Sequence, residues 1–248
     1  MSWVSGLSLI LNGEGKMPGK IIYEKSLMDM VYVFEDREDA GRMLAKKLRK
    51  LKIERAIILA IPSGGVPVGY AISRELGIPM DLMISRKVQI PYNPEAGFGA
   101  VAPDGSTILN EPLVRELGLK EEEITFLARQ VLEEIERRNK VFRGDRPLPD
   151  LIGKTVILVD DGLASGYTML AAIKSVKKRK PKRVIVAVPT APPSSARLVA
   201  QHVDKLICLN IRRGPFFAVA DAYQKWYDLK DREVMDYIRR VRETGLNP

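Results

Sequence analysis

The sequence lacks the features that mark several classes of protein. It has one cysteine, Cys208, so no disulfide can form within the chain, and a reducing cytoplasm is the expected location. One histidine, His202, leaves no His/Cys cluster for a zinc site. No segment reaches about 18 consecutive apolar residues, the length at which a membrane-spanning helix is expected. We therefore expect a cytoplasmic protein without membrane association.

The composition is that of an ordinary globular protein. Its 248 residues are 46% hydrophobic and 29% charged, and the length suits one large domain. The formal net charge is +9, but residues 174–183 alone hold seven Lys and Arg residues and no acid. The rest of the chain is therefore close to neutral. Abundant Lys, Arg and Glu also fit the composition of thermophilic proteins.

From Phe34 onward, continuous apolar runs alternate with segments whose apolar residues recur at helical spacing. Strands are expected over 56–61, 80–85, 155–160, 183–189 and 205–210. Helices are expected over 36–51, 66–76, 112–117, 121–143, 168–179, 194–202 and 231–243. This alternation predicts an α/β fold, with a Rossmann-like parallel sheet and helices on both of its faces.

Two regions depart from the alternation. Residues 1–30 contain two short apolar runs around a turn and are interpreted as an N-terminal extension, either a hairpin or a frayed segment. Residues 31–248 form the domain itself, with a helical insertion at about 107–147. Within the domain, residues 86–106 hold three prolines and three glycines. Loops of that length are often functional, so we expect a mobile lid there.

The most informative segment is 156–168, VILVDDGLASGYT. A buried strand ends in two carboxylates, Asp160 and Asp161, and a short loop then leads into a helix. The loop holds Gly162, Ser165, Gly166 and Thr168. Ligands of open α/β sheets bind beyond the carboxyl ends of the strands, and a glycine-containing loop that opens a helix favours an anion. Carboxylates beside it accept hydrogen bonds from hydroxyl groups, so a ribose 5-phosphate fits both halves.

This segment resembles the PRPP-binding signature of the type I phosphoribosyltransferases. The resemblance implies the phosphoribosyltransferase fold with a small hood, and a site in which Asp160 and Asp161 hold the ribose hydroxyls. The implied PRPP-binding residues are Asp160, Asp161, Gly162, Leu163, Ala164, Ser165, Gly166, Tyr167 and Thr168. The stretch from about Phe34 to Ile238 resembles a bacterial and archaeal branch of this family whose acceptor is unassigned.

Two further elements follow in the order of that family. Ser63, Gly64 and Gly65 occupy the place of the loop that binds pyrophosphate through backbone N–H groups. Members of the branch often carry Arg where this chain has Ser63, so the loop is one positive charge short. Arg86 and Lys87 begin the predicted lid and, by the resemblance, meet the leaving pyrophosphate.

The resemblance implies transfer of ribose 5-phosphate from PRPP to a small-molecule acceptor, most simply a nitrogenous base, with release of pyrophosphate. The catalytic residues would be Asp160, Asp161 and Lys87, with Mg²⁺ reached by the two acids indirectly, through its bound water or PRPP. The acceptor pocket would include Phe216, Phe217 and Asp221. In 6-oxopurine enzymes an acid stands at the position of Ala164, so hypoxanthine and guanine are disfavoured as acceptors.

Other functions remain open. A regulator of the same fold would sense PRPP and bind RNA or DNA through the basic residues 174–183, although no helix-turn-helix segment is visible. PRPP synthetase carries a similar signature but needs a second, related domain. The resemblance also implies a homodimer.

Overall fold

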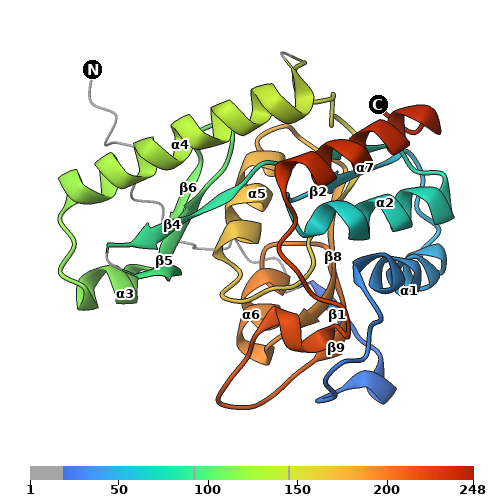
Figure 1. Cartoon of the computed structure of the whole chain (residues 1–248), viewed down its shortest axis with the longest axis horizontal. Helices are drawn as coiled ribbons and strands as arrows, with labels where there is room; N and C mark the ends of the chain where they lie inside the picture. The colour runs from blue at the N-terminus through green and yellow to red at the C-terminus, as the bar shows by residue number, and fades with distance from the viewer. Residues whose placement is uncertain (1–18, 92, 145) are drawn as a thin grey trace.

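A six-stranded sheet lies at the centre of the protein, in a computed structural model that describes residues 19–91, 93–144 and 146–248 (Figure 1). All of its strand pairings are parallel. The strands lie in the order β1 (Lys20–Ile22), β9 (Lys205–Ile211), β8 (Arg183–Ala191), β7 (Thr155–Val159), β2 (Ala56–Ala60) and β3 (Met80–Leu82). Parallel strands end at the same edge of a sheet, so the loops after β2, β3 and β7 meet there.

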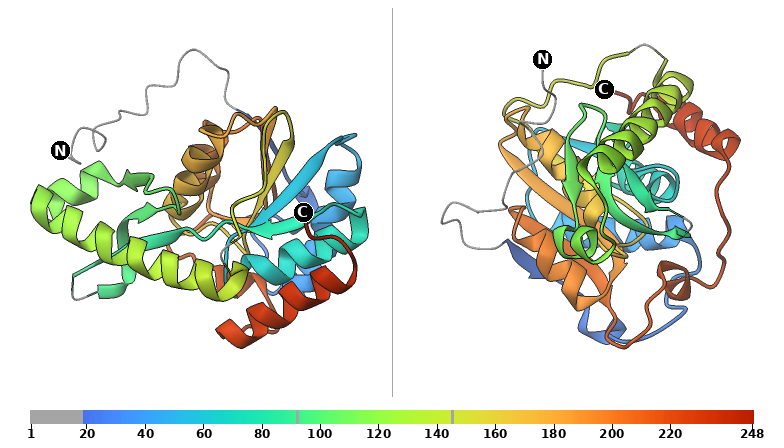
Figure 2. Two further views of the ribbon diagram at one scale, coloured as in Figure 1. Left: turned by 90° about the horizontal axis from the view of Figure 1, so that it is seen from above. Right: turned by 90° about the vertical axis from the view of Figure 1, so that its left-hand side faces the viewer.

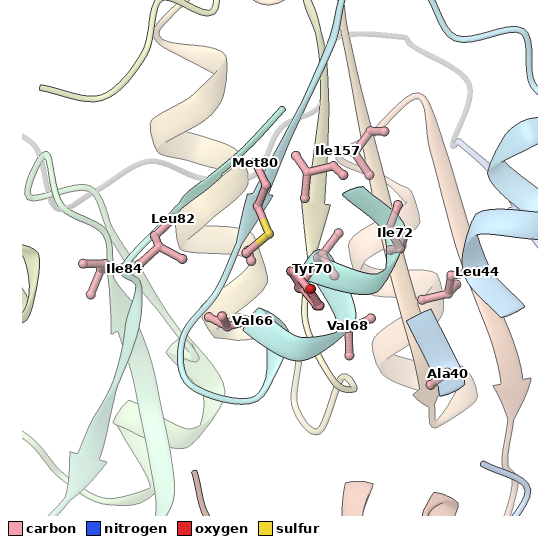
Figure 3. Packing of buried hydrophobic residues seen from close by; sticks show 14 of the residues in the cluster. Ala40, Leu44, Val66, Val68, Tyr70, Ile72, Met80, Leu82, Ile84 and Ile157 are labelled. Carbon is pink, nitrogen blue, oxygen red and sulfur yellow. The ribbon is translucent and has the colours of Figure 1, made fainter. Parts of the chain in front are cut away.

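Helices cover both faces of this sheet, because successive strand side chains point to opposite faces and both sets are apolar. Ile58 and Ile157 belong to one core, together with residues of α1 (Arg37–Arg49), α2 (Gly65–Leu76) and α7 (Asp231–Glu243). Figure 3 shows this packing around α2. Ile57 and Leu158 belong to the opposite core, with residues of α5 (Tyr167–Lys177) and α6 (Pro193–Ala200). The predicted fold class is confirmed.

A second, antiparallel sheet projects from the first, as Figures 1 and 2 show. It consists of β4 (Arg86–Ile90), β5 (Asn93–Val101) and β6 (Thr107–Leu109). The chain continues through α3 (Glu111–Glu116) into the long α4 (Glu121–Arg143), which runs back along this sheet toward α7. We call β4–β6, α3 and α4 the arm. Within the arm, α4 extends from the outer end of the antiparallel sheet to the edge of the central sheet.

The prediction of an irregular loop over 86–106 is wrong, because most of these residues form the hairpin of β4 and β5. Val88, Phe98 and Ala100 are buried, which fixes the hairpin in place. Gly99 is needed for strand packing, since a Cβ atom there would lie 2.6 Å from the carbonyl oxygen of Ile108. Prolines and glycines concealed the strand pattern in the sequence.

The prediction that residues 1–30 form an N-terminal extension is wrong for residues 19–30. β1 pairs with β9, and the amide of Glu24 donates to the carbonyl of Leu209 at 3.0 Å, so the chain belongs to the domain from residue 19 onward. The side-chain amide of the buried Asn210 donates to the carbonyls of Leu27 and Met30, which holds the 3₁₀ turn η2 (Lys25–Leu27) beside β9. The first apolar run of the predicted hairpin lies outside the described residues.

The remaining predicted elements are present with small shifts at their ends. The segment after β9 adds the 3₁₀ turn η3 (Val219–Ala222), which lies beside β8. Cys208 is buried in β9, and burial raises the pKa of its thiol. Within the described part of the chain, no helix has the length and apolar character needed to cross a bilayer.

Candidate active site

The residues with the strongest sequence signal lie together at the carboxyl end of β7. Asp160 and Asp161 follow the strand directly, and α5 begins after Gly166. The tip of the intervening loop, Ala164 and Ser165, is exposed. No side chain caps the start of α5, so the N–H groups of its first turn face away from the helix without intrahelical partners. Backbone donors of the kind that favour an anion therefore lie beside two carboxyl groups.

Asp161 is held by a cation from a distant part of the chain. The Nε atom of Arg37, in the first turn of α1, donates to Oδ2 of Asp161 at 2.8 Å. The guanidinium of Arg37 also lies 3.9 Å from the ring centroid of Trp226 and donates to the carbonyl of Tyr227 at 3.0 Å. Arg37 is 6% exposed, so this is a largely buried arrangement that links Asp161 to the segment after β9.

Asp160 is in a different electrostatic position. Among the described residues it forms no ion pair, and its Oδ1 accepts a hydrogen bond from the amide of Asp161 at 2.9 Å. Burial and the neighbouring Asp161 hold the pKa of Asp160 well above its usual range. Burial also raises the pKa of Asp161, although Arg37 opposes this. A hydroxyl donor or a cation at Asp160 would therefore be strongly favoured.

The predicted pyrophosphate loop lies directly against these acids. A Cβ atom on Gly64 would lie 1.8 Å from Oδ2 of Asp161, so no larger residue fits there without movement of the carboxylate. The peptide bond between Pro62 and Ser63 is cis, and the amide of Gly65 donates to the carbonyl of Ile61 at 3.0 Å. The Ser63 hydroxyl accepts a hydrogen bond from Arg138 of α4 at 2.9 Å.

A pocket of about 420 Å³ opens beside Asp160 and reaches toward α4. Pro62 and Ser85 line it at the edge of the central sheet, Arg86 and Lys87 line it from β4 of the arm, and Thr168 lines it at the start of α5. The Ser85 hydroxyl is buried and has no hydrogen-bond partner in the described part of the chain. The structure thus places the predicted residues Arg86 and Lys87 in one pocket with Asp160.

The three residues predicted for the acceptor lie elsewhere, in the segment after β9. Phe216 is 90% exposed. Phe217 lies 5.2 Å from the guanidinium of Arg212, and Asp221 pairs with the same Arg212 at 2.9 Å. None of the three lines the 420 Å³ pocket. Their role in binding an acceptor stays a prediction.

Sequence reasoning missed three residues of this site. Arg37 carried a weak signal, because a cation in the first turn of a helix opposes the helix dipole and so suggests a partner outside the helix. The hydroxyl of Tyr223 donates to the carbonyl of Asp161 at 2.6 Å. Tyr223 is one of several aromatic residues in this part of the sequence, and nothing in the sequence distinguishes it from the others. Arg138 carried no signal, since it is one of many charged residues in α4.

Comparisons with known proteins identify the family of the chain. A family model described as "Phosphoribosyl transferase domain" matches residues 33–223. Two proteins of Mycobacterium tuberculosis, each named "Putative phosphoribosyl transferase" (MT0597 and Rv0571c), are 35% identical over 209 residues, which is 84% of this chain and 47% of each relative. The chain therefore spans about half the length of these curated relatives.

Among solved structures, the chain is similar to the protein TT1426 from Thermus thermophilus. The two are 32% identical with a TM-score of 0.69, and the match covers 84% of this chain and 98% of TT1426. The similarity therefore extends over nearly the whole of that structure.

Proposed function

The chain belongs to the phosphoribosyl transferase domain family, and we propose that it transfers ribose 5-phosphate from PRPP to a nitrogenous acceptor. One observation carries this proposal: the uncapped start of α5 lies beside the carboxyl pair Asp160 and Asp161. In this proposal, the start of α5 binds a terminal phosphate, and the carboxyl pair binds hydroxyl groups of the same ligand. A phosphorylated pentose has this arrangement of groups.

In the proposed reaction, a bond forms between the acceptor nitrogen and ribose C1 while the bond from C1 to pyrophosphate breaks. The electron pair of the broken bond leaves on the pyrophosphate oxygen, and the proton released by the nitrogen passes to solvent. The loop 162–168 would hold the 5-phosphate and Asp160 the ribose hydroxyls, so C1 would face the loop 62–65. Arg86 and Lys87 would then attract the departing negative charge, which makes positioning and electrostatics the main sources of catalysis.

The residues present fit a magnesium ion that is bound mainly through substrate oxygens. In the described part of the chain, no group of three or more His, Cys, Asp or Glu residues forms a cage for a metal. Asp160, with its raised pKa and no ion-pair partner among described residues, is suited to accept from metal-bound water. When bound, Mg²⁺ supplies charge neutralisation on the pyrophosphate group.

Titration of Mg-PRPP in a calorimeter tests the proposal. Wild type is expected to bind, Asp160→Asn should bind at least about tenfold more weakly, and Glu122→Gln, an exposed acid at the start of α4, should match wild type. Incubation with a panel of nitrogenous bases should then release pyrophosphate. Absence of PRPP binding by the wild type would refute the proposal.

The regulator hypothesis loses part of its support. Lys174 donates to the carbonyl of Thr107 at 3.1 Å and Lys178 pairs with Asp104 at 3.0 Å, so two cations of the 174–183 cluster hold the arm against α5. Binding of RNA at low salt, with affinity falling steeply as salt rises, would revive that hypothesis. The homodimer, the cytoplasmic location and the thermophilic source remain predictions.

A further inference from the structure

A buried guanidinium from the arm, that of Arg138, contacts the loop 62–65. Arg138 of α4 is 6% exposed, and one of its terminal nitrogens donates both to the Ser63 hydroxyl at 2.9 Å and to Asp231 of α7 at 2.7 Å. Its Nε atom is buried and has no hydrogen-bond partner among the described residues. A buried donor without an acceptor is costly, so Arg138 favours a further acceptor. Arg138 does not itself line the 420 Å³ pocket, and its hydrogen bond to Ser63 connects it to the loop whose Pro62 does.

A second guanidinium lies close to the first. Arg86, which lines the 420 Å³ pocket, has its pKa lowered by burial and by the positive charge of Arg138. Its ion pair with Glu134 of α4 is long at 3.9 Å, and the Glu134 side chain is 35% exposed. Arg86 and Arg138 lie close together, and the nearby carboxylates neutralise their positive charge only in part. Binding of an anion beside them is therefore favoured.

The acids that compensate these cations are partly exposed, and each contacts two arginines. Asp231 is 41% exposed and contacts both Arg138 and Arg137, while Glu134 contacts both Arg86 and Arg137. A phosphate oxygen arriving in the pocket would compete with a partly solvated carboxylate, and not with a fully buried ion pair. Exchange of a carboxylate for a phosphate therefore requires little reorganisation.

We infer that Arg138, together with Arg86, binds the pyrophosphate group of PRPP and of the product, and so completes a loop whose own side chain, Ser63, is neutral. This inference rests on the proposed function. Guanidinium groups bind phosphate oxygens with two parallel hydrogen bonds, and pyrophosphate offers several such oxygens. Arg138 acts on the leaving group both directly and by orienting the Ser63 hydroxyl. The arm is thus part of the substrate site.

Binding of magnesium pyrophosphate, measured by calorimetry, tests the inference without need of an acceptor. Arg138→Met should weaken the affinity at least about tenfold. Arg129→Met serves as the control, because it removes the same charge from the same helix at a side chain that is 80% exposed. Its affinity should stay within about threefold of wild type. Equal affinity of Arg138→Met and wild type would overturn the inference.

A variant that is expected to raise the affinity for pyrophosphate distinguishes a binding role of Arg138 from a packing role. Asp231→Asn removes the carboxylate that competes for Arg138, so it should tighten pyrophosphate binding by about threefold or more. If Arg138 only ties α4 to α7, this variant should weaken binding or leave it unchanged, and the inference would fail. Wild-type binding of Mg-PRPP separates the two proposals: PRPP binding that is insensitive to Arg138 refutes this inference alone, whereas no PRPP binding refutes both.

Discussion

Replacement of Arg37 by Met removes the charge that compensates Asp161 and keeps most of the side-chain volume. The side chains of Arg37 and Asp161 are 7% and 15% exposed, so the remaining carboxylate would be largely buried without a cation. Loss of one partner from a buried ion pair costs about 3–5 kcal/mol, and loss of the stack on Trp226 adds about 1 kcal/mol. We therefore expect the free energy of unfolding to fall by about 4–6 kcal/mol at neutral pH.

The pH dependence has a defined sign. Arg37 lowers the pKa of Asp161, so its removal lets burial raise that pKa further. The destabilisation is then largest where Asp161 is ionised and shrinks as the pH falls and the carboxyl is protonated. Urea unfolding at neutral and acid pH measures the difference. The double variant with Asp161→Asn should recover part of the loss.

The control for this experiment is Arg42→Met, in the same helix. Arg42 pairs with Asp39 at 3.4 Å, with side chains 43% and 30% exposed, and exposed pairs contribute about 0–1 kcal/mol. If Arg37→Met costs no more than Arg42→Met, or if its cost is the same at neutral and acid pH, the electrostatic account of Asp161 is refuted.

Three further predictions follow from the contacts of the site and its support. Asp160→Asn should raise the free energy of unfolding at neutral pH by about 1 kcal/mol, and the gain should disappear at acid pH, where wild-type Asp160 is protonated; urea unfolding measures both. Gly64→Ala should weaken calorimetric binding of Mg-PRPP at least about tenfold, because the new methyl group displaces the carboxylate beside it. Arg143→Met should cost about 3–5 kcal/mol in urea unfolding, because Arg143 and Asp81 pair at 2.7 Å with side chains 3% and 8% exposed, while PRPP affinity measured under folding conditions stays unchanged.

The parts of the site that could be predicted from the sequence are those made by neighbours along the chain. The run from Val156 to Thr168 contains its own strand, its acids and its helix start, so local pattern and turn chemistry are sufficient to place them. The same holds for the loop 62–65 between β2 and α2. Because both strands are parallel and adjacent, their following loops had to meet at one edge.

The parts that could not be predicted are those made across long sequence separations. Arg37 and Asp161 are 124 residues apart, and Arg138 and Ser63 are 75 residues apart. No period or motif in the sequence encodes such pairs, because each arginine sits in an amphipathic helix where a solvated charge is the ordinary outcome. Only the packing of α1 and α4 against the sheet edge brings them to the loops.

The arm illustrates a second limit of sequence interpretation. The sequence pattern did not predict the hairpin of β4 and β5, because Gly97 and Gly99 of β5 belong to a residue type that is depleted in strands. Their conformational cost is offset by close contact, since Cβ atoms at these positions would lie 3.0 Å from the carbonyl oxygen of Val88 and 2.6 Å from that of Ile108, respectively. A glycine that permits close packing and a glycine that permits bending look the same in a sequence.

These contacts also explain how opposite charges coexist at one sheet edge without neutralising each other. On the side of β7, Arg37 satisfies Asp161 from α1, which leaves Asp160 available to hydroxyl groups. On the side of the arm, Asp231 of α7 pairs with Arg138 but leaves its Nε atom without a hydrogen-bond partner among the described residues. Each half has a partner of opposite charge outside the loops, and the loop 62–65 lies between them because Gly64 can touch Asp161 while Ser63 contacts Arg138. We therefore expect a ligand with hydroxyls at one end and phosphate charge at the other to contact both halves at once, whereas a simple anion would contact only the cationic half.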